Sequence, residues 1–426
     1  MRRLPAAQLL LLGGTLALTL GVLEWTAPWL YSIFEGTPFP RAELLIKLER
    51  PSLEWRSESS EDLAKLPPYI ANKVIHPYLG FVADPSAVGV NPLGFYGPLP
   101  KRDVEASDFR VGLFGGSVAL RNAPYLQKAL AAALPGRRVR VSCFALDGYK
   151  QPQQLLALAY LVAIGTSMDV AVNLDGFNEI ALPYSENLVA GVNVFFPRSW
   201  QLFSRSLTSP EIAEKVVDLH RAKAAYDWWR SGFDESLVKH SNLLLLIWSM
   251  VERRKDRQTR QADENLRKLL REAPELPRDL GPPSHYDSPE ALFDDLVRAW
   301  SEGSRSMESL CRASGIRYFH FLQPNQYVPG SKPLSKWERS NATTPGPFRD
   351  AATQAYPLLV AQGATLRASG IRFWDLTGVF SGLSETLYSD NCCHLNENGN
   401  QILAETMASI LAGELGQVKT EVAPSR

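Results

Sequence analysis

The chain lacks an excess of charge of either sign, because its 426 residues include 45 basic and 45 acidic side chains. Without a basic surplus there is no general attraction for a polyanion, so nucleic acid is not expected as a partner. Glycine (29 residues) and proline (30 residues) stay near average usage, which excludes collagen-like and low-complexity chains. Since 45% of the residues are hydrophobic, we expect an ordinary globular protein with a large core.

Cysteine is scarce, and the sequence holds only Cys143, Cys311, Cys392 and Cys393. Four cysteines are too few for a disulfide scaffold in a chain of this length. No two of them have the C-x-x-C spacing of a zinc site, so we predict no metal and no other cofactor. Two interpretations stay open: Cys392 or Cys393 pairs with Cys143, or all four are small buried apolar groups.

Charge is absent from residues 4–23, where one glutamine and two threonines are the polar side chains. A helix of about 20 such residues matches the hydrocarbon thickness of a bilayer. Arg2 and Arg3 precede the run and Glu24 follows it, which predicts that the remainder lies outside the cytoplasm. We predict a single-pass signal anchor in residues 1–31, in the cell inner membrane, with a periplasmic or extracellular catalytic domain. A cleavable signal peptide is the alternative.

From residue 108 onward, short apolar stretches alternate with segments of helical periodicity. Such an alternation of strands and helices implies an α/β fold with a parallel sheet and right-handed crossovers. The predicted strands cover residues 109–114, 138–144, 168–174, 316–322 and 371–376.

Residues 185–300 interrupt this alternation with amphipathic helices, and we interpret them as a helical insertion that forms a lid. Their most apolar run, residues 243–248, is far too short to span a membrane and predicts a buried helix face. The predicted domains are a signal anchor (1–31), a stalk and cap (32–104), the two parts of the α/β domain (105–184 and 301–416), the insertion (185–300) and a tail (417–426).

The triplet Gly115-Gly116-Ser117 follows the first predicted strand of the sheet. In open α/β sheets, reactive groups gather at the carboxyl ends of the strands. Two glycines allow a tight turn that exposes the Ser117 hydroxyl at a helix start, where the Ser117 N–H can face an oxyanion. Such triplets are more often simple turns, so Ser117 is a candidate nucleophile only together with further motifs.

Three further motifs stand at the matching places along the chain. Gly148 follows the second strand, a Gly-x-Asn triplet ending in Asn178 follows the third, and Asp390 and His394 precede the last helix. In order and placement, these motifs and the Ser117 triplet resemble the four blocks of the SGNH/GDSL hydrolase family, here a membrane-anchored bacterial member. The resemblance implies the SGNH hydrolase fold, a flavodoxin-like three-layer α/β/α sandwich with a central parallel sheet.

Carried over by position, the resemblance assigns Ser117 as the nucleophile and His394 as its general base, later the acid that protonates the leaving oxygen. It also assigns an oxyanion hole. The donors would be the backbone N–H groups of Ser117 and Gly148 and the side-chain amide of Asn178.

Two positions depart from the family pattern. Gly116 stands where the first block usually has Asp, which is compatible with the turn because the turn needs a small residue. In the last block, Asp390 lies four residues before His394, and Asn391 occupies the usual position three residues before it. Asp390 can orient the imidazole if the intervening loop bulges, and we favour it. Asn391 or a backbone carbonyl is the alternative.

The resemblance implies an extracytoplasmic serine esterase, similar to carboxylesterases and acetylesterases. Its substrate would be an O-acyl or O-acetyl ester of a glycan or lipid, hydrolysed through an acyl-enzyme on Ser117, and its membrane contact would be the N-terminal helix. Two alternatives stay open. One is an O-acetyltransferase that passes the acyl group to a cell-surface polysaccharide. The other is an inactive binding module of the same fold, for which the displaced Asp390 is the only support.

Overall fold

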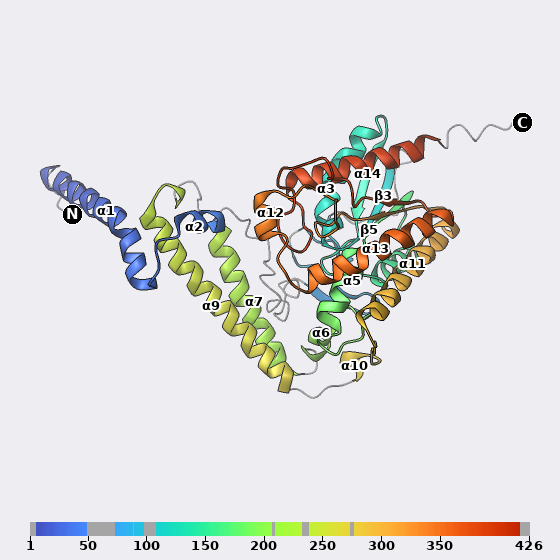
Figure 1. Cartoon of the computed structure of the whole chain (residues 1–426), viewed down its shortest axis with the longest axis horizontal. Coiled ribbons are helices and arrows are strands. Elements are labelled where there is room, and N and C mark those ends of the chain that lie inside the picture. Colours follow the sequence, from blue (N-terminus) through green and yellow to red (C-terminus); the bar gives the residue numbers. More distant parts are fainter. Residues whose placement is uncertain are drawn as a thin grey trace, which may run out of the picture. The chain divides into compact units, whose positions relative to one another are not determined.

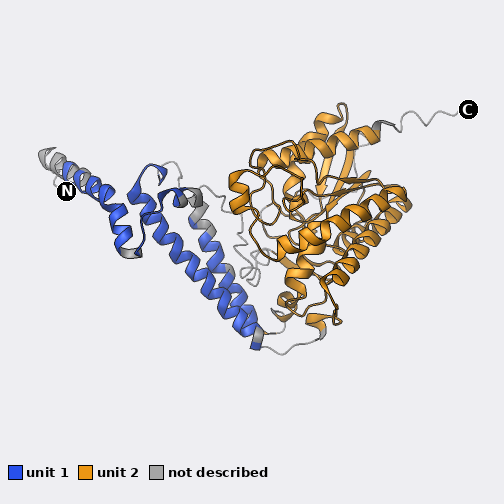
Figure 2. Ribbon diagram, in the orientation of Figure 1, with its two compact units in different colours: residues 1–55, 210–273 blue, residues 56–209, 274–426 orange. Residues whose placement is uncertain are grey.

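The computed structural model of the chain separates into two compact units (Figure 2). Unit 1 joins residues 1–55 to residues 210–273, and unit 2 joins residues 56–209 to residues 274–426. The structure describes residues 6–48, 73–87, 89–97, 108–206, 209–231, 238–272 and 277–417.

Unit 2 is built on a five-stranded, wholly parallel sheet. Its strand order corresponds to the flavodoxin-like order 2-1-3-4-5, with the middle strand buried along its whole length. The predicted α/β fold with a central parallel sheet is therefore confirmed. In spatial order, the strands are β4 (Arg138–Cys143), β3 (Asp108–Gly115), β5 (Val170–Asp175), β6 (Arg317–Leu322) and β7 (Phe373–Asp375).

Helices cover both faces of this sheet, as right-handed crossovers require (Figure 1). One face carries α3 (Ser117–Ala133) and α14 (Glu397–Gln417), which pack against each other. The helices packed together on the other face are α4 (Gln153–Ala163), α5 (Phe177–Leu182), α11 (Pro289–Ala313) and α13 (Pro347–Ala368).

Smaller elements complete unit 2. An antiparallel hairpin pairs β1 (Lys73–His76) with β2 (Gly80–Ala83), and the Tyr149 hydroxyl donates to the Phe81 carbonyl at 2.7 Å. This hairpin lies within the predicted cap segment, of which residues 49–72, 88 and 98–104 fall outside the described residues. The short helices are the π-helix Pro183–Asn187, α6 (Trp200–Ser206), α10 (Pro277–Leu280) and α12 (Lys336–Asn341).

Unit 1 is helical in the part of the chain that the structure describes. The predicted insertion, residues 185–300, is not one body: residues 210–273 join the N-terminal segment, whereas the flanking residues belong to unit 2. The physical reason is that α11 packs its apolar face against the helices and strands of the sheet. The helices of unit 1 are α1 (Ala6–Glu35), α2 (Arg41–Leu48), α7 (Pro210–Ser231) and α9 (Asn242–Glu272).

The N-terminal helix α1 contains most of the uncharged run at residues 4–23 and continues to Glu35. Among the described residues, no helix has both the length and the apolar character needed to cross a membrane. The predicted transmembrane crossing therefore gains no support from the structure. Residues 4 and 5 of the run, and the predicted tail beyond residue 417, lie outside the described residues.

Candidate active site

The turn between β3 and α3 places Ser117 at the carboxyl edge of the sheet, as the first residue of α3. Gly115 has φ +144°, and a Cβ there would collide with the Leu174 carbonyl oxygen of the neighbouring strand. A Cβ at Gly116 would collide with the Asn178 side-chain amide. Both glycines are therefore required by close approach, and any larger residue at position 116 would displace Asn178.

Three side chains form a continuous hydrogen-bonded string in this edge. The Ser117 Oγ lies 2.7 Å from His394 Nε2, and His394 Nδ1 lies 2.5 Å from Asp390 Oδ2. None of the three residues is more than 9% exposed. The string has the order and the distances that allow an imidazole to take the hydroxyl proton while a carboxylate holds the ring.

The loop before α14 accommodates the four-residue spacing by a local bulge. Cys393 adopts a left-handed φ of +60°, and Asp390 Oδ1 accepts two backbone N–H groups of the loop, at 2.8 and 3.2 Å. The Asn391 amide instead donates to the Thr344 hydroxyl at 2.9 Å. Asp390, and not Asn391, therefore contacts the imidazole ring of His394.

The charge state of Asp390 follows from its surroundings. Burial raises the pKa of this carboxyl, but the charge of His394 and the hydrogen bond from His394 lower it, and Arg121 adds to the lowering. The resulting pKa lies below the ordinary value for Asp. Asp390 therefore stays ionised at neutral pH and can stabilise an imidazolium.

The three predicted oxyanion donors lie on adjoining loops. The Asn178 amide packs over Gly116, next to Ser117, and donates to the Tyr149 carbonyl at 2.8 Å. Gly148 directly precedes Tyr149 and has φ +79°, a backbone conformation that favours glycine. The hydrogen bond from Asn178 therefore fixes the amide against the Gly148 loop, which brings the side-chain donor and the two backbone donors to one edge of the sheet.

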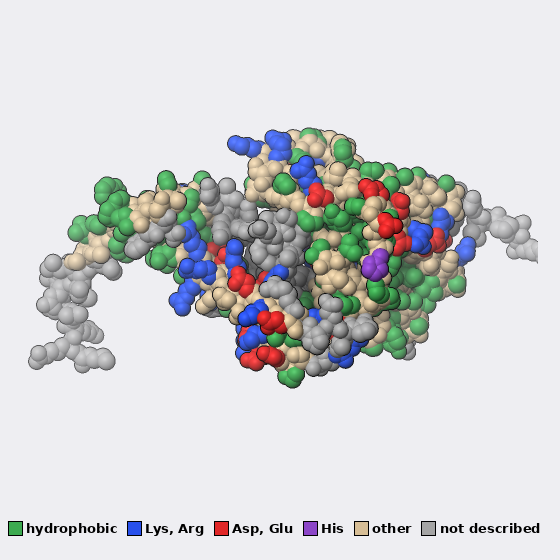
Figure 3. Space-filling view, turned by 60° about the horizontal axis from the view of Figure 1, so that its bottom comes forward, with side chains coloured by type: hydrophobic (Ala, Val, Ile, Leu, Met, Phe, Trp, Pro, Cys, Tyr) green, Lys and Arg blue, Asp and Glu red, His purple; other side chains and the backbone are tan. Residues whose placement is uncertain are grey.

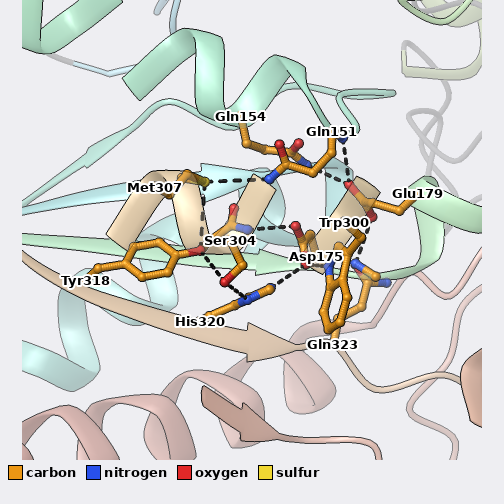
Figure 4. Close-up of polar contacts among 12 residues, drawn as sticks. Gln151, Gln154, Asp175, Glu179, Trp300, Ser304, Met307, Tyr318, His320 and Gln323 are labelled. Atoms are coloured by element: carbon orange, nitrogen blue, oxygen red, sulfur yellow. Dashed lines mark hydrogen bonds and ion pairs between the residues drawn. The ribbon is translucent and has the colours of Figure 1, made fainter. Parts of the chain in front are cut away.

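Sequence reasoning missed Glu179, a carboxyl that ties two of these loops together (Figure 4). Its Oε2 accepts the Gly176 N–H at 2.8 Å, and its Oε1 accepts the Gln154 amide at 2.7 Å and the Gln151 N–H at 3.3 Å. Burial, followed by the charge of Asp175, raises the pKa of Glu179 to about 8. An acidic residue directly after the Gly-x-Asn triplet, just before an apolar run at residues 180–182, was the available signal.

A second Ser-His-Asp string is formed by Ser304, His320 and Asp175 (Figure 4). Asp175 Oδ1 is 2.8 Å from His320 Nε2 and accepts the Trp300 indole N–H at 2.7 Å, while Ser304 Oγ is 2.8 Å from His320 Nδ1. These side chains are at most 1% exposed, so no substrate can reach them. The string is a structural network that connects β5, β6 and α11 below the site.

An ion pair also borders the Gly148 loop. Arg198 Nε donates to Glu186 Oε2 at 2.6 Å, and the second guanidinium nitrogen donates to the other carboxylate oxygen. A Cβ at Gly148 would lie 2.8 Å from Arg198 Cδ, so the arginine stem covers the glycine. Glu186 belongs to the π-helix Pro183–Asn187, a type of irregularity often found at functional sites. Neither residue was predicted.

All four cysteines are free, so neither Cys392 nor Cys393 is bonded to Cys143. Three are buried and Cys392 is half-buried, in agreement with the interpretation of cysteine as a small apolar group. Burial raises the pKa of Cys143 and of Cys311 to about 12, so these two thiols stay protonated and unreactive. Within the described ranges, no cluster of three or more His, Cys, Asp or Glu side chains could hold a metal ion.

A parallel α/β sheet with a Ser-His-Asp string at its carboxyl edge defines a candidate serine hydrolase site. No family model matches the chain, and no curated protein matches it. Among solved structures it is similar to a Bacteroides fragilis protein described as an acylhydrolase, with 11% identity and a TM-score of 0.34, over 75% of this chain and 91% of that one. It is also similar to a GDSL-like lipase from Bacteroides thetaiotaomicron, with 11% identity and a TM-score of 0.32, over 75% and 92%.

Both of these structural neighbours carry descriptions that agree with the SGNH/GDSL resemblance of the four sequence motifs. The Ser117–His394–Asp390 string defines the chemistry that the site can perform.

Proposed function

We propose that the protein is a serine esterase of the SGNH/GDSL type that works through an acyl-enzyme on Ser117. The observation that carries the proposal is the string from the Ser117 hydroxyl through His394 to Asp390, with distances of 2.7 and 2.5 Å. The inactive binding module rested only on the displaced Asp390. That support is lost, because the bulged loop brings the carboxylate to the imidazole.

In the first half of the reaction, Ser117 Oγ attacks the ester carbonyl carbon while His394 Nε2 takes the hydroxyl proton. Asp390 stabilises the imidazolium that forms. The tetrahedral oxyanion accepts hydrogen bonds from Asn178 and from the backbone N–H groups of Ser117 and Gly148. His394 then gives the proton to the leaving alkoxide, and the acyl group stays on the serine.

In the second half, a water molecule attacks the acyl-enzyme, and His394 takes a proton from that water. The same donors hold the second oxyanion. When the bond to Ser117 Oγ breaks, His394 returns the proton to the serine and the carboxylic acid leaves. The cycle consumes one ester and one water and restores every residue to its starting state.

We further propose that the substrate is an O-acyl or O-acetyl ester of a glycan or lipid outside the cytoplasm, and that the N-terminal segment holds the enzyme at the inner membrane. The support lies in the sequence: Arg2 and Arg3 precede the uncharged run at residues 4–23, the charge distribution of an N-in segment.

A serine-directed fluorophosphonate tests the proposal on the full chain. We expect labelling of Ser117 in the wild type, none in Ser117→Ala, and much slower labelling in His394→Ala. Ser117→Ala should also lose turnover across a panel of p-nitrophenyl esters while its thermal unfolding stays nearly unchanged. Activity that survives in Ser117→Ala, or equal labelling with and without His394, would refute the nucleophile and base assignments.

A further inference from the structure

The first half of α9 presents two different faces. Leu245 and Trp248 are buried in a cluster with Leu44 and Val238, all within unit 1. Ile247, in contrast, is 44% exposed, and Met250 one turn later is 56% exposed. The apolar run at residues 243–248 thus has the predicted buried face, and Ile247 lies on a second, exposed side of the helix.

The exposed face of α9 changes character along the helix. Residues at spacings of three and four lie on one side of a helix, and Ile247, Met250, Arg254 and Arg257 follow that spacing. All four are exposed, and we call them the α9 stripe. The stripe is apolar over its first turn and basic over the next two turns.

Helix α1 has an exposed apolar face of its own. It packs against α9 through Ala27 and Tyr31, which cluster with Leu246. On its other side, Trp25 is 84% exposed and Trp29 is 64% exposed, again at helical spacing. Figure 3 shows apolar side chains along this end of unit 1, with basic side chains gathered beside them.

Glu24 of α1 holds the start of α9 beside α1 through hydrogen bonds. It is the first charged residue after the uncharged run at residues 4–23, and its carboxylate receives the Ser241 hydroxyl at 2.6 Å and the Leu243 N–H at 3.0 Å. The first turn of α9 is thereby fixed to the end of the uncharged run of α1. Leu246, which directly precedes Ile247 of the α9 stripe, packs with Ala27, which lies between Trp25 and Trp29, so the start of the stripe lies beside this segment of α1.

We propose that α1 and α9 together form a docking surface for an anionic lipid bilayer. Tryptophan is enriched at the boundary between headgroups and acyl chains, which suits Trp25 and Trp29. Ile247 and Met250 enter the same boundary from the α9 stripe, and Arg254 and Arg257 contact lipid phosphates. This inference concerns unit 1 only, and neither helix contributes a residue to the candidate active site, so it stands or falls independently of the esterase.

The experiment places a fluorophore at two matched positions of the full chain. Met250→Cys and Val217→Cys are labelled with an environment-sensitive dye; Val217, on α7 of the same unit, is 44% exposed and lies outside the surface. The wild type, labelled in parallel, gives the background from native thiols. In vesicles of phosphatidylglycerol and phosphatidylcholine, the dye at position 250 should shift to the blue and be quenched severalfold more by a bilayer-borne quencher than the dye at position 217.

A charge variant tests the basic part of the stripe. Arg254→Glu together with Arg257→Glu should cut the lipid quenching at position 250 severalfold in anionic vesicles, with esterase activity unchanged. Equal quenching of positions 250 and 217 by aqueous iodide, without lipid quenching at 250, would overturn the proposal. A blue shift that depends on protein concentration but shows no lipid quenching would also overturn it, since a second copy of the chain would then cover the stripe.

Discussion

At the residue scale, the position of the carboxylate is the feature that distinguishes this site. Asp390 reaches His394 over four residues because Cys393 adopts a left-handed φ of +60°, which non-glycine residues rarely do. The sequence leaves the choice between Asp390 and Asn391 open, because nothing in the residue types signals that conformation. Only the folded loop shows that the carboxylate lies on the ring.

Removing this carboxylate should therefore have a large effect. We expect Asp390→Ala to lose about three to four orders of magnitude in kcat/KM, since the imidazolium loses its stabilising charge. Asn391→Ala should lose about tenfold or less, because its amide binds Thr344 and not the ring. Hydrolysis of a p-nitrophenyl ester measures both. The reverse ranking would mean that Asn391 orients His394.

Glu179 predicts a pH dependence of stability. Its pKa of about 8 in the folded protein lies above the ordinary value of 4.5. Between these values the folded state binds more protons than the unfolded state, so the stability that this group contributes is full at low pH and is lost as the pH rises towards 8.

Differential scanning fluorimetry from pH 5 to pH 8 checks this dependence. Glu179→Gln removes the titrating group, so the melting temperature of the wild type should fall relative to that of the variant as the pH rises across about 4.5 to 8. Parallel curves for the two proteins would show that the Glu179 carboxyl does not titrate in this window.

At the element scale, the junction of β3 with α3 couples the nucleophile to the oxyanion hole. A methyl group at Gly116 would collide with the Asn178 amide, so Gly116→Ala should displace this donor. We expect a loss of about two to three orders of magnitude in kcat, the typical effect of losing one oxyanion donor. Gly378→Ala is the matched control, because a Cβ there meets no atom within 4 Å. Similar kinetics of the two variants would contradict the coupling.

The strands of the sheet could be predicted from the sequence, whereas the partners of the long helices could not. The segment predicted at residues 109–114 became β3, because a buried parallel strand leaves an apolar run that is easy to recognise. Both α9 and α11 show an amphipathic pattern, but the pattern does not say what each apolar face packs against. For this reason the sequence did not indicate that residues 185–300 divide between the two units.

The same limit applies to the candidate site. The four motifs located Ser117 and His394 because each motif is local in sequence and lies at a strand end. Glu179 and Arg198 were missed because their importance depends on contacts between loops, which one segment does not reveal. The backbone turns of the site can therefore be predicted from local sequence motifs. The side chains that join the loops can be identified only from the folded structure.

At the scale of the whole molecule, the proposed location has a direct test. A reporter fused after Arg426 should be active only in an extracytoplasmic compartment, because two arginines precede the uncharged run. Mass spectrometry of the mature protein should find residues 4–23 retained. An N-terminus near residue 25 would instead identify a cleaved signal peptide, and a reporter active only in the cytoplasm would refute the location.

The contact between Glu24 and Ser241 also has a consequence for biosynthesis, because the two residues are 217 positions apart. At about 5 to 20 residues per second, roughly 10 to 40 s pass between the synthesis of α1 and that of its partner helix. Throughout this interval the nascent chain presents α1 without α9. Any partner of the free helix can therefore bind it before unit 1 assembles, and the delay is set by the order of the segments along the chain.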